Sequence, residues 1–210
     1  MSGAAGPRLR VLALGDSYTI GEGVEPDGRW PLQLTRALRE GGVALGDPQI
    51  IATTGWTTDE LSAGIDAAAP TGGFDLVSLL IGVNNQYRGR SLDEYRMQFE
   101  ALLERAITLA GGRADRVLVL SIPDWGTTPF ARQSGRDRNL IAQEIDAFNA
   151  VARDACAAGA VAFVDVTAHG RAHAADTAML ADDGLHPSAA AYSAWARLAL
   201  PVARRLLSRP

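Results

Sequence analysis

Lysine is missing from this chain, and all 20 of its cationic side chains are arginine. This absence excludes mechanisms that require a lysine, such as a Walker-A phosphate site or a Schiff base with a carbonyl substrate. The formal net charge of −4 argues against a nucleic-acid-binding protein, because such proteins normally carry a basic face. We therefore expect no nucleic-acid partner.

Cysteine and long apolar runs are also scarce. The single Cys156 cannot form an internal disulfide, and its place in an apolar helical pattern predicts a buried structural thiol rather than a nucleophile. No segment approaches the ~20 residues of a membrane span, and the apolar run before Gly15 is shorter than the ~7–15-residue core of a signal peptide. We expect a cytoplasmic protein without stable membrane insertion, as a monomer or small homo-oligomer.

Five short runs rich in Val, Ile and Leu predict parallel strands that are buried on both faces. They are Arg10–Leu14, Gln49–Thr53, Leu76–Ile81, Val117–Ile122 and Val161–Val166. Each run is followed by a helical pattern, and this alternation predicts an α/β protein. We expect a three-layer αβα sandwich around a five-stranded parallel sheet, in one domain that spans residues 1–210.

The predicted helices carry recognisable ends. Thr57 and Ser91 each stand three residues before a glutamate, which is the spacing of a capping box. The last helix is predicted to begin at Pro187 and to bend at Pro201.

The triplet Gly15-Asp16-Ser17 follows the first predicted strand. By itself this triplet is typical of a turn that ends a strand, in which Asp16 accepts hydrogen bonds from the backbone. It also holds a serine hydroxyl at the carboxyl edge of the sheet, where parallel α/β proteins bind their ligands. The remaining strand ends decide between these interpretations.

Four further groups are predicted to reach the same edge, and together they supply the parts of an acyl-transfer site. Ser17 is the candidate nucleophile, and His186 is the candidate base that accepts its proton. Asp183, three residues earlier, can hold the other imidazole nitrogen. The backbone N–H groups of Ser17 and Gly55 and the side-chain amide of Asn84 can stabilise the oxyanion.

With these residues the chain resembles the SGNH hydrolase superfamily, the GDSL-type esterases and lipases. The matching blocks, in order along the chain, are Gly15-Asp16-Ser17, Gly55, Gly82-Val83-Asn84 and Asp183-Gly184-Leu185-His186. The resemblance implies a flavodoxin-like fold and hydrolysis of carboxylic esters or thioesters without a metal or other cofactor. It also implies an acyl-enzyme on Ser17 and oxyanion donors at Ser17, Gly55 and Asn84.

Two residues depart from the family's pattern. Tyr18 follows Ser17 where the family usually has leucine, and Asn85 follows Asn84 where it usually has aspartate. Because the donor Asn84 is intact, we expect the surrounding contacts to differ while catalysis is retained. Ser17 does not lie in a Gly-x-Ser-x-Gly elbow, so the α/β-hydrolase fold is not supported.

Four aromatic residues fall in loops at the predicted edge. Either they cap the core, or they wall a pocket for the acyl or alcohol group. They are Trp56, Tyr87, Trp125 and Phe130. The segment Ile122–Gly135 is the candidate for a variable substrate loop.

His169 and His173 are spaced four apart, as metal ligands on a helix are, and Asp165 or Asp176 lies near them in the sequence. Nothing else completes a metal site, and Gly170 weakens a helix here. We expect a solvated loop and no metal.

The sequence thus predicts a serine esterase acting on small or medium acyl esters. A thioesterase or lysophospholipase of the same fold, or an O-acetyl carbohydrate deacetylase, remains an alternative. A receiver-like signalling module is excluded, because Gly82 stands where the phosphoacceptor aspartate belongs and the required lysine is missing. A non-catalytic binding domain derived from a hydrolase stays open, although the complete set of residues argues against it.

Overall fold

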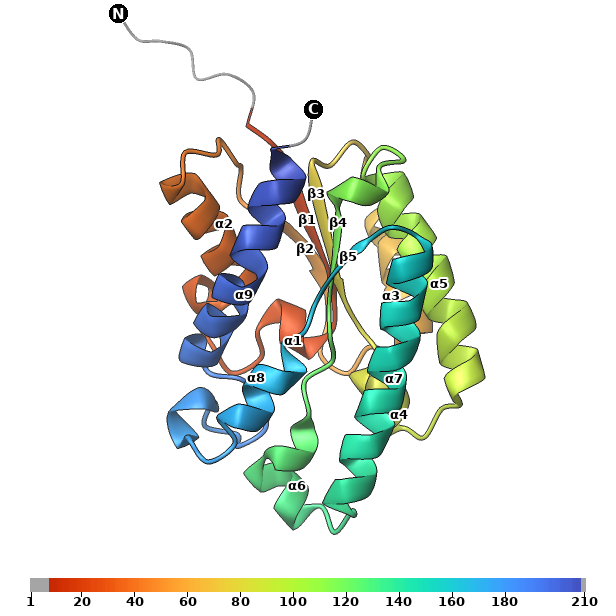
Figure 1. The fold of residues 1–210 in the computed structure, drawn as a ribbon, viewed down its shortest axis with the longest axis vertical. Coiled ribbons are helices and arrows are strands. Elements are labelled where there is room, and N and C mark those ends of the chain that lie inside the picture. Colours follow the sequence, from red (N-terminus) through yellow and green to blue (C-terminus); the bar gives the residue numbers. More distant parts are fainter. Residues whose placement is uncertain (1–7, 209–210) are drawn as a thin grey trace, which may run out of the picture.

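A five-stranded parallel sheet forms the centre of the molecule, in a computed structural model that describes residues 8–208 (Figure 1). The strand order is β2-β1-β3-β4-β5, and every neighbouring pair runs parallel. The strands are β1 (Val11–Gly15), β2 (Gln49–Ala52), β3 (Leu76–Leu80), β4 (Val117–Leu120) and β5 (Ala162–Val164). The predicted fold class and all five strands are confirmed.

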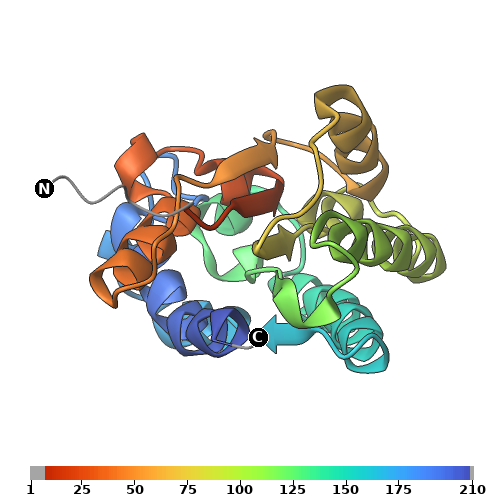
Figure 2. The same cartoon turned by 90° about the horizontal axis from the view of Figure 1, so that it is seen from above.

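Helices cover both faces of the sheet (Figure 2). One layer contains α2 (Trp30–Glu40) and α9 (Ala189–Leu207), and the other contains α3 (Thr58–Ala68), α5 (Leu92–Leu109) and α7 (Arg138–Ala158). Four short helices lie toward the carboxyl edge: α1 (Ser17–Ile20), α4 (Val83–Tyr87), α6 (Pro129–Gln133) and α8 (Thr167–Ala172) (Figure 1). The 3₁₀ turns are η1 (Pro26–Gly28), η2 (Ala114–Arg116), η3 (Trp125–Thr127) and η4 (Thr177–Met179). Within the described range, no helix has the length and apolar character needed to cross a membrane.

The last two strands are shorter than predicted, because polar side chains accept hydrogen bonds from the backbone N–H groups that follow each strand. β4 stops before Ser121 and Ile122, and the N–H of Ile122 donates to the Asn149 side chain at 2.7 Å. β5 stops before Asp165, whose carboxylate accepts the N–H of Thr167 at 2.9 Å and so begins α8. Apolar patterning alone does not reveal such side-chain competition for the backbone.

The helix ends follow the predicted capping chemistry. The N–H of Thr57 donates to Glu60 at 2.9 Å, and the Ser91 hydroxyl accepts the N–H of Glu94 at 3.2 Å. The last helix begins two residues later than predicted, because Pro187 is in a bridge to Leu180 and Ser188 caps the helix instead.

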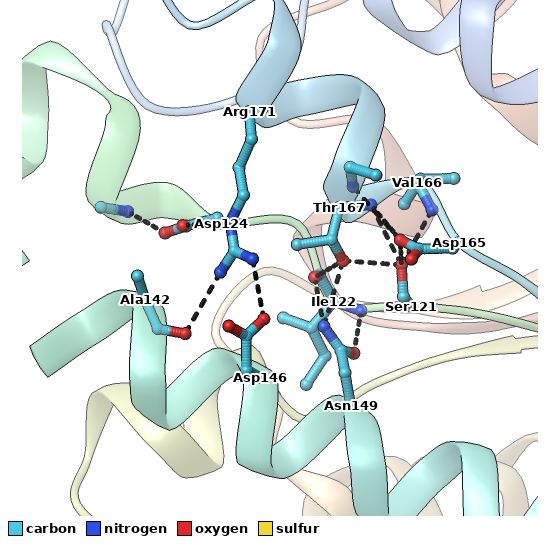
Figure 3. Close-up of polar contacts among 12 residues, drawn as sticks. Ser121, Ile122, Asp124, Ala142, Asp146, Asn149, Asp165, Val166, Thr167 and Arg171 are labelled. Carbon is cyan, nitrogen blue, oxygen red and sulfur yellow. Dashed lines mark hydrogen bonds and ion pairs between the residues drawn. The ribbon is translucent and has the colours of Figure 1, made fainter. Parts of the chain in front are cut away.

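The prediction of a solvated loop at His169 is wrong. His169 lies in α8 and His173 caps its C-terminus, with the two rings 4.1 Å apart. Side chains outside the helix compensate for Gly170: Ser121 accepts the N–H of Val166 at 2.8 Å, beside the Asp165 cap (Figure 3). In the described part of the chain, no group of three His, Cys, Asp or Glu is arranged to hold a metal ion.

A tight turn joins β1 to α1. A Cβ on Gly15 would stand 2.2 Å from the Thr19 hydroxyl and 2.5 Å from the Leu80 carbonyl, so only glycine fits. Asp16 is fully buried, and one of its oxygens accepts the N–H of Tyr18 at 3.0 Å, as predicted for a turn tether. Its other oxygen is buried without a hydrogen-bond partner among residues 8–208. This burial raises the pKa of Asp16 from 3.8 to about 7.

The buried carboxyl makes stability depend on pH. Because burial raises the pKa of Asp16 in the folded state to about 7, its stabilising effect is complete below pH ~4 and is lost as the pH rises to about 7. Asp16→Asn keeps the shape and the acceptor oxygen but cannot ionise. We expect the free energy of unfolding of the variant, relative to wild type, to increase by roughly 2–3 kcal/mol between pH 5 and pH 8. Urea titrations at the two pH values measure this difference. If the difference in unfolding free energy between Asp16→Asn and wild type is the same at both pH values, the raised pKa of Asp16 is contradicted. The same holds if Asp182→Asn, at an exposed control site, shows an equal change with pH.

Candidate active site

Ser17 stands at the point where the order of the sheet reverses. The chain leaves β1 in one direction to reach β2 and later enters β3 on the other side of β1. A crevice forms at such a switch point, outside the carboxyl ends of the strands. Ser17 is the first residue of α1, and its carbonyl accepts the N–H groups of Gly21 and Glu22 at 2.9 and 3.0 Å. The turn thus fixes the backbone of the candidate nucleophile.

Four of the predicted site residues, Ser17, Gly55, Asn84 and His186, line one pocket of about 220 Å³. They come from the ends of β1, β2 and β3 and from the loop before α9. We call this space the catalytic pocket. The remaining residues that line it are Tyr18, Thr54, Val83, Tyr87, Trp125, Phe130 and Leu185.

Asp183 holds the His186 ring from the side away from the pocket. Its Oδ2 lies 2.5 Å from Nδ1 of His186, and its Oδ1 accepts the backbone N–H groups of Leu185 and His186 at 2.9 Å each. Partial burial opposes ionisation of the carboxyl, but these hydrogen bonds outweigh it and keep the pKa of Asp183 below its usual value. An ionised Asp183 accepts a hydrogen bond from Nδ1–H, which leaves Nε2 as the basic nitrogen.

Ser17 and His186 line the same pocket, but no hydrogen bond joins them among the described residues. The His186 ring is hydrogen-bonded to Asp183 instead. The contact between a nucleophile and its base is often long before substrate binds, and it tightens in the substrate complex. Shared lining of one pocket is the geometry that permits this closure.

Asn84 is oriented by one of its two amide hydrogens. Its Nδ2 donates to the Trp56 carbonyl at 2.9 Å, and the second hydrogen of the same nitrogen remains for a ligand. Gly55 has φ of +87°, a conformation that favours glycine. Its carbonyl accepts Arg88 Nη2 at 2.6 Å, which fixes the peptide that follows the candidate oxyanion donor.

Asn85, the second departure from the family pattern, has a defined structural role. It is buried; its side-chain oxygen accepts the N–H of Thr58 at 3.1 Å and its amide donates to the Thr58 hydroxyl at 2.7 Å. The Thr58 hydroxyl in turn donates to Gln98. Because that hydroxyl proton is already used, its oxygen needs a donor, which asparagine supplies and an ionised aspartate does not.

Three of the four predicted aromatic wall residues, Tyr87, Trp125 and Phe130, line the catalytic pocket. The Trp125 ring lies 5.4 Å from Tyr87 and 6.1 Å from Phe130, and its N–H donates to Gln86 at 2.8 Å. The prediction that Trp56 walls the pocket is corrected by the structure. Its ring packs tightly over Gly64 of α3 and does not line the catalytic pocket. Its contribution is the carbonyl that orients Asn84.

Sequence reasoning missed four lining residues. Tyr18 directly follows the block that ends at Ser17, and Leu185 lies in the block that ends at His186, so their proximity to these residues was a usable signal. Thr54 directly precedes Gly55, and Val83 directly precedes Asn84, but neither residue type by itself indicates a pocket wall.

Comparisons with known proteins agree on one family. A model of the GDSL-like lipase/acylhydrolase family matches residues 13–194. The fold is similar to the crystal structure of TesA, with a TM-score of 0.74 and 20% identity over 94% of this chain and 99% of that chain. It is also similar to a lipase/acylhydrolase from Enterococcus faecalis, with a TM-score of 0.68 and 21% identity over 96% of each chain.

A third similar structure is the W215I form of Axe2, an acetyl xylan esterase from Geobacillus stearothermophilus, with a TM-score of 0.69 and 21% identity over 95% of this chain and 94% of that chain. A search of curated proteins returned no match. The family match covers most of the chain and includes the blocks that hold Ser17, Gly55, Asn84 and His186. The chain belongs to the GDSL-like lipase/acylhydrolase family of carboxylic ester hydrolases.

Proposed function

We propose that this protein is a serine esterase that hydrolyses carboxylic esters of small or medium acyl chains through an acyl-enzyme. The observation that carries the proposal is the convergence of Ser17, Gly55, Asn84 and an Asp183-bound His186 on one pocket. These groups supply a nucleophile, a base, an orienting carboxylate and oxyanion donors, which are the parts that acyl transfer needs.

The first half of the reaction forms the acyl-enzyme. His186 Nε2 takes the proton of the Ser17 hydroxyl while Oγ bonds to the ester carbonyl carbon. The negative charge moves to the carbonyl oxygen, which accepts hydrogen bonds from the N–H groups of Ser17 and Gly55 and from the amide of Asn84. His186 then gives its proton to the alcohol oxygen as the carbon–oxygen bond breaks.

The second half repeats these steps with water. His186 takes a proton from the water as its oxygen attacks the acyl carbon, and it returns that proton to Ser17 as the carboxylic acid leaves. Asp183 stays ionised throughout, because its hydrogen bonds hold its pKa below the usual value. Its charge keeps the ring in one tautomer and stabilises the imidazolium.

Loss of the nucleophile is the first test. We expect Ser17→Ala to abolish hydrolysis of p-nitrophenyl acetate, because the alanine has no oxygen to form the acyl-enzyme. A fluorophosphonate probe should add one label to wild type, at Ser17, and none to the variant. Ser193→Ala, which removes a hydroxyl from α9, is the matched control and should retain both activity and label. Full activity of Ser17→Ala, with a melting temperature like that of wild type, contradicts the proposal.

Two adjacent carboxylates provide the second test. Asp183→Asn should lower kcat by roughly 10³–10⁴-fold, because the amide leaves His186 in the wrong tautomer. Asp182→Asn removes a neighbouring carboxylate that makes no contact with the ring. Steady-state kinetics on p-nitrophenyl acetate should therefore separate the two variants by at least a hundredfold. Equal losses in both would assign the effect to the loop as a whole and contradict the role given to Asp183.

The same assay identifies the substrate class. A panel with p-nitrophenyl esters, acyl-CoA thioesters, lysophospholipid and acetylated sugars, run beside Ser17→Ala, separates the simple esterase from the thioesterase, lysophospholipase and deacetylase alternatives. We expect the p-nitrophenyl esters of short and medium acids to be the better substrates, because the pocket is walled by aromatic side chains close to Ser17. A preference for acyl-CoA or lysophospholipid contradicts this choice.

A further inference from the structure

A second cavity of about 60 Å³ lies beside the catalytic pocket. The two spaces share three lining residues, Tyr18, Trp125 and Leu185. We call the second space the inner cavity. On its other sides it is bounded by residues of α8, η4 and α9, among them Met179 and Trp195. Its walls are mostly apolar, which suits a hydrocarbon group better than a sugar or a phosphate.

Two of the three shared walls are fixed in place. The Trp125 N–H is bonded to Gln86 at 2.8 Å, so this ring cannot turn without losing a buried hydrogen bond. The Tyr18 ring is packed between His186 and Trp195, at centroid distances of 5.7 and 6.0 Å. Leu185 is the aliphatic member of the three shared walls, so shortening its side chain opens space between the two pockets without breaking a hydrogen bond or a ring contact.

The backbone that carries Leu185 is held on both sides. The N–H of Ala181 donates to the His186 carbonyl at 2.8 Å, and the N–H of Phe130 donates to the Gly184 carbonyl at 3.1 Å. The position of the Leu185 side chain is therefore set by the same loop that positions His186.

The far wall of the inner cavity is also built rigidly. Arg171 of α8 donates to the buried Asp124 at 2.8 Å and to Asp146 of α7 at 2.8 Å, as Figure 3 shows. Asp124 in turn accepts the N–H of Gly126 at 2.9 Å. This network ties α8 to the loop that carries Trp125, so the inner cavity is bounded by preformed elements.

We propose that Leu185 limits the length of the acyl chain by closing the catalytic pocket off from the inner cavity, which takes the distal end of a longer acyl chain once that side chain is shortened. This inference rests on the proposed esterase function. The acyl group, unlike the alcohol, remains covalently attached to Ser17 between the two halves of the reaction. The inner cavity lies behind a wall of the catalytic pocket, so we assign it to the acyl group, whereas the alcohol must leave after the first half.

The size of the cavity gives the expected gain in chain length. Because a cavity of about 150 Å³ holds the six carbons of benzene, a space of about 60 Å³ takes about two carbon atoms. Removing the Leu185 side chain should join the two spaces. Esters longer than those that fill the catalytic pocket then become better substrates.

The experiment measures kcat/KM for p-nitrophenyl esters from acetate to dodecanoate. For each variant it uses the ratio of each ester to acetate, so that any general loss of activity cancels. We expect Leu185→Ala to move the optimum by about two carbons and to raise the ratio for the longer esters by about tenfold or more. Leu198→Ala is the matched control, because it deletes the same side chain from an exposed site on α9 and should leave the profile unchanged.

A second variant, which fills the inner cavity, tests whether the gain in Leu185→Ala comes from that cavity. Ala191 is a buried residue of α9 that lines the inner cavity, and Ala191→Leu places a larger side chain there. In the Ala191→Leu/Leu185→Ala double variant the gain for longer esters should disappear. Gly170→Leu, at a position where an added Cβ meets nothing within 4 Å, gives a second blocking variant if Ala191→Leu fails to fold.

Each outcome has one meaning. Activity on acetate with an unchanged acyl profile in Leu185→Ala overturns the inference while the esterase function stands. If Leu185→Ala changes the preference for alcohol length in a series of alkyl acetates but not the preference for acyl length, the inner cavity takes the alcohol. That result overturns the assignment to the acyl chain. Wild-type protein that hydrolyses none of the esters overturns the proposed function, and the inference with it.

Discussion

The Asp183 carboxylate is the contact on which the catalytic arrangement depends. Its two oxygens accept the His186 ring and two backbone N–H groups from within four residues of chain. This closes the loop before α9 around one charged group and orients the ring by local geometry alone. The same loop carries Leu185 between the catalytic pocket and the inner cavity. The proposed orientation of the base and the proposed limit on acyl length thus depend on the same loop.

Much of the fold and of the candidate site was predictable from the sequence, because both depend on regular patterns. Apolar runs gave the five strands, and parallel strands bring their carboxyl ends to one edge, which explains why Ser17, Gly55 and Asn84 converge. Asp183 and His186 needed only their spacing of three residues to be paired.

The errors have physical causes of a different kind. Sequence gives the position of Trp56 in the chain but not the direction of its ring, which packs on Gly64 of α3 instead of facing the pocket. The helix at His169 was missed because Gly170 lowers local helix propensity, whereas Asp165 and the distant Ser121 supply the cap. The packing of Trp56 and the Ser121 contact are tertiary and have no local pattern, whereas Asp165 was a local capping signal that the sequence contained.

Two carboxyl groups near Ser17 are given opposite properties by their surroundings. Burial raises the pKa of Asp16 to about 7, whereas hydrogen bonds from the His186 ring and two amides keep the pKa of Asp183 below its usual value. Below neutral pH the buried group is therefore mostly uncharged and the partly exposed group is ionised. In the proposed mechanism, a fully charged Asp16 next to Ser17 would compete with Asp183 for the positive charge that develops on His186 and would oppose the oxyanion. Burying one carboxyl while solvating the other confines the negative charge to the side of the ring where it stabilises the imidazolium.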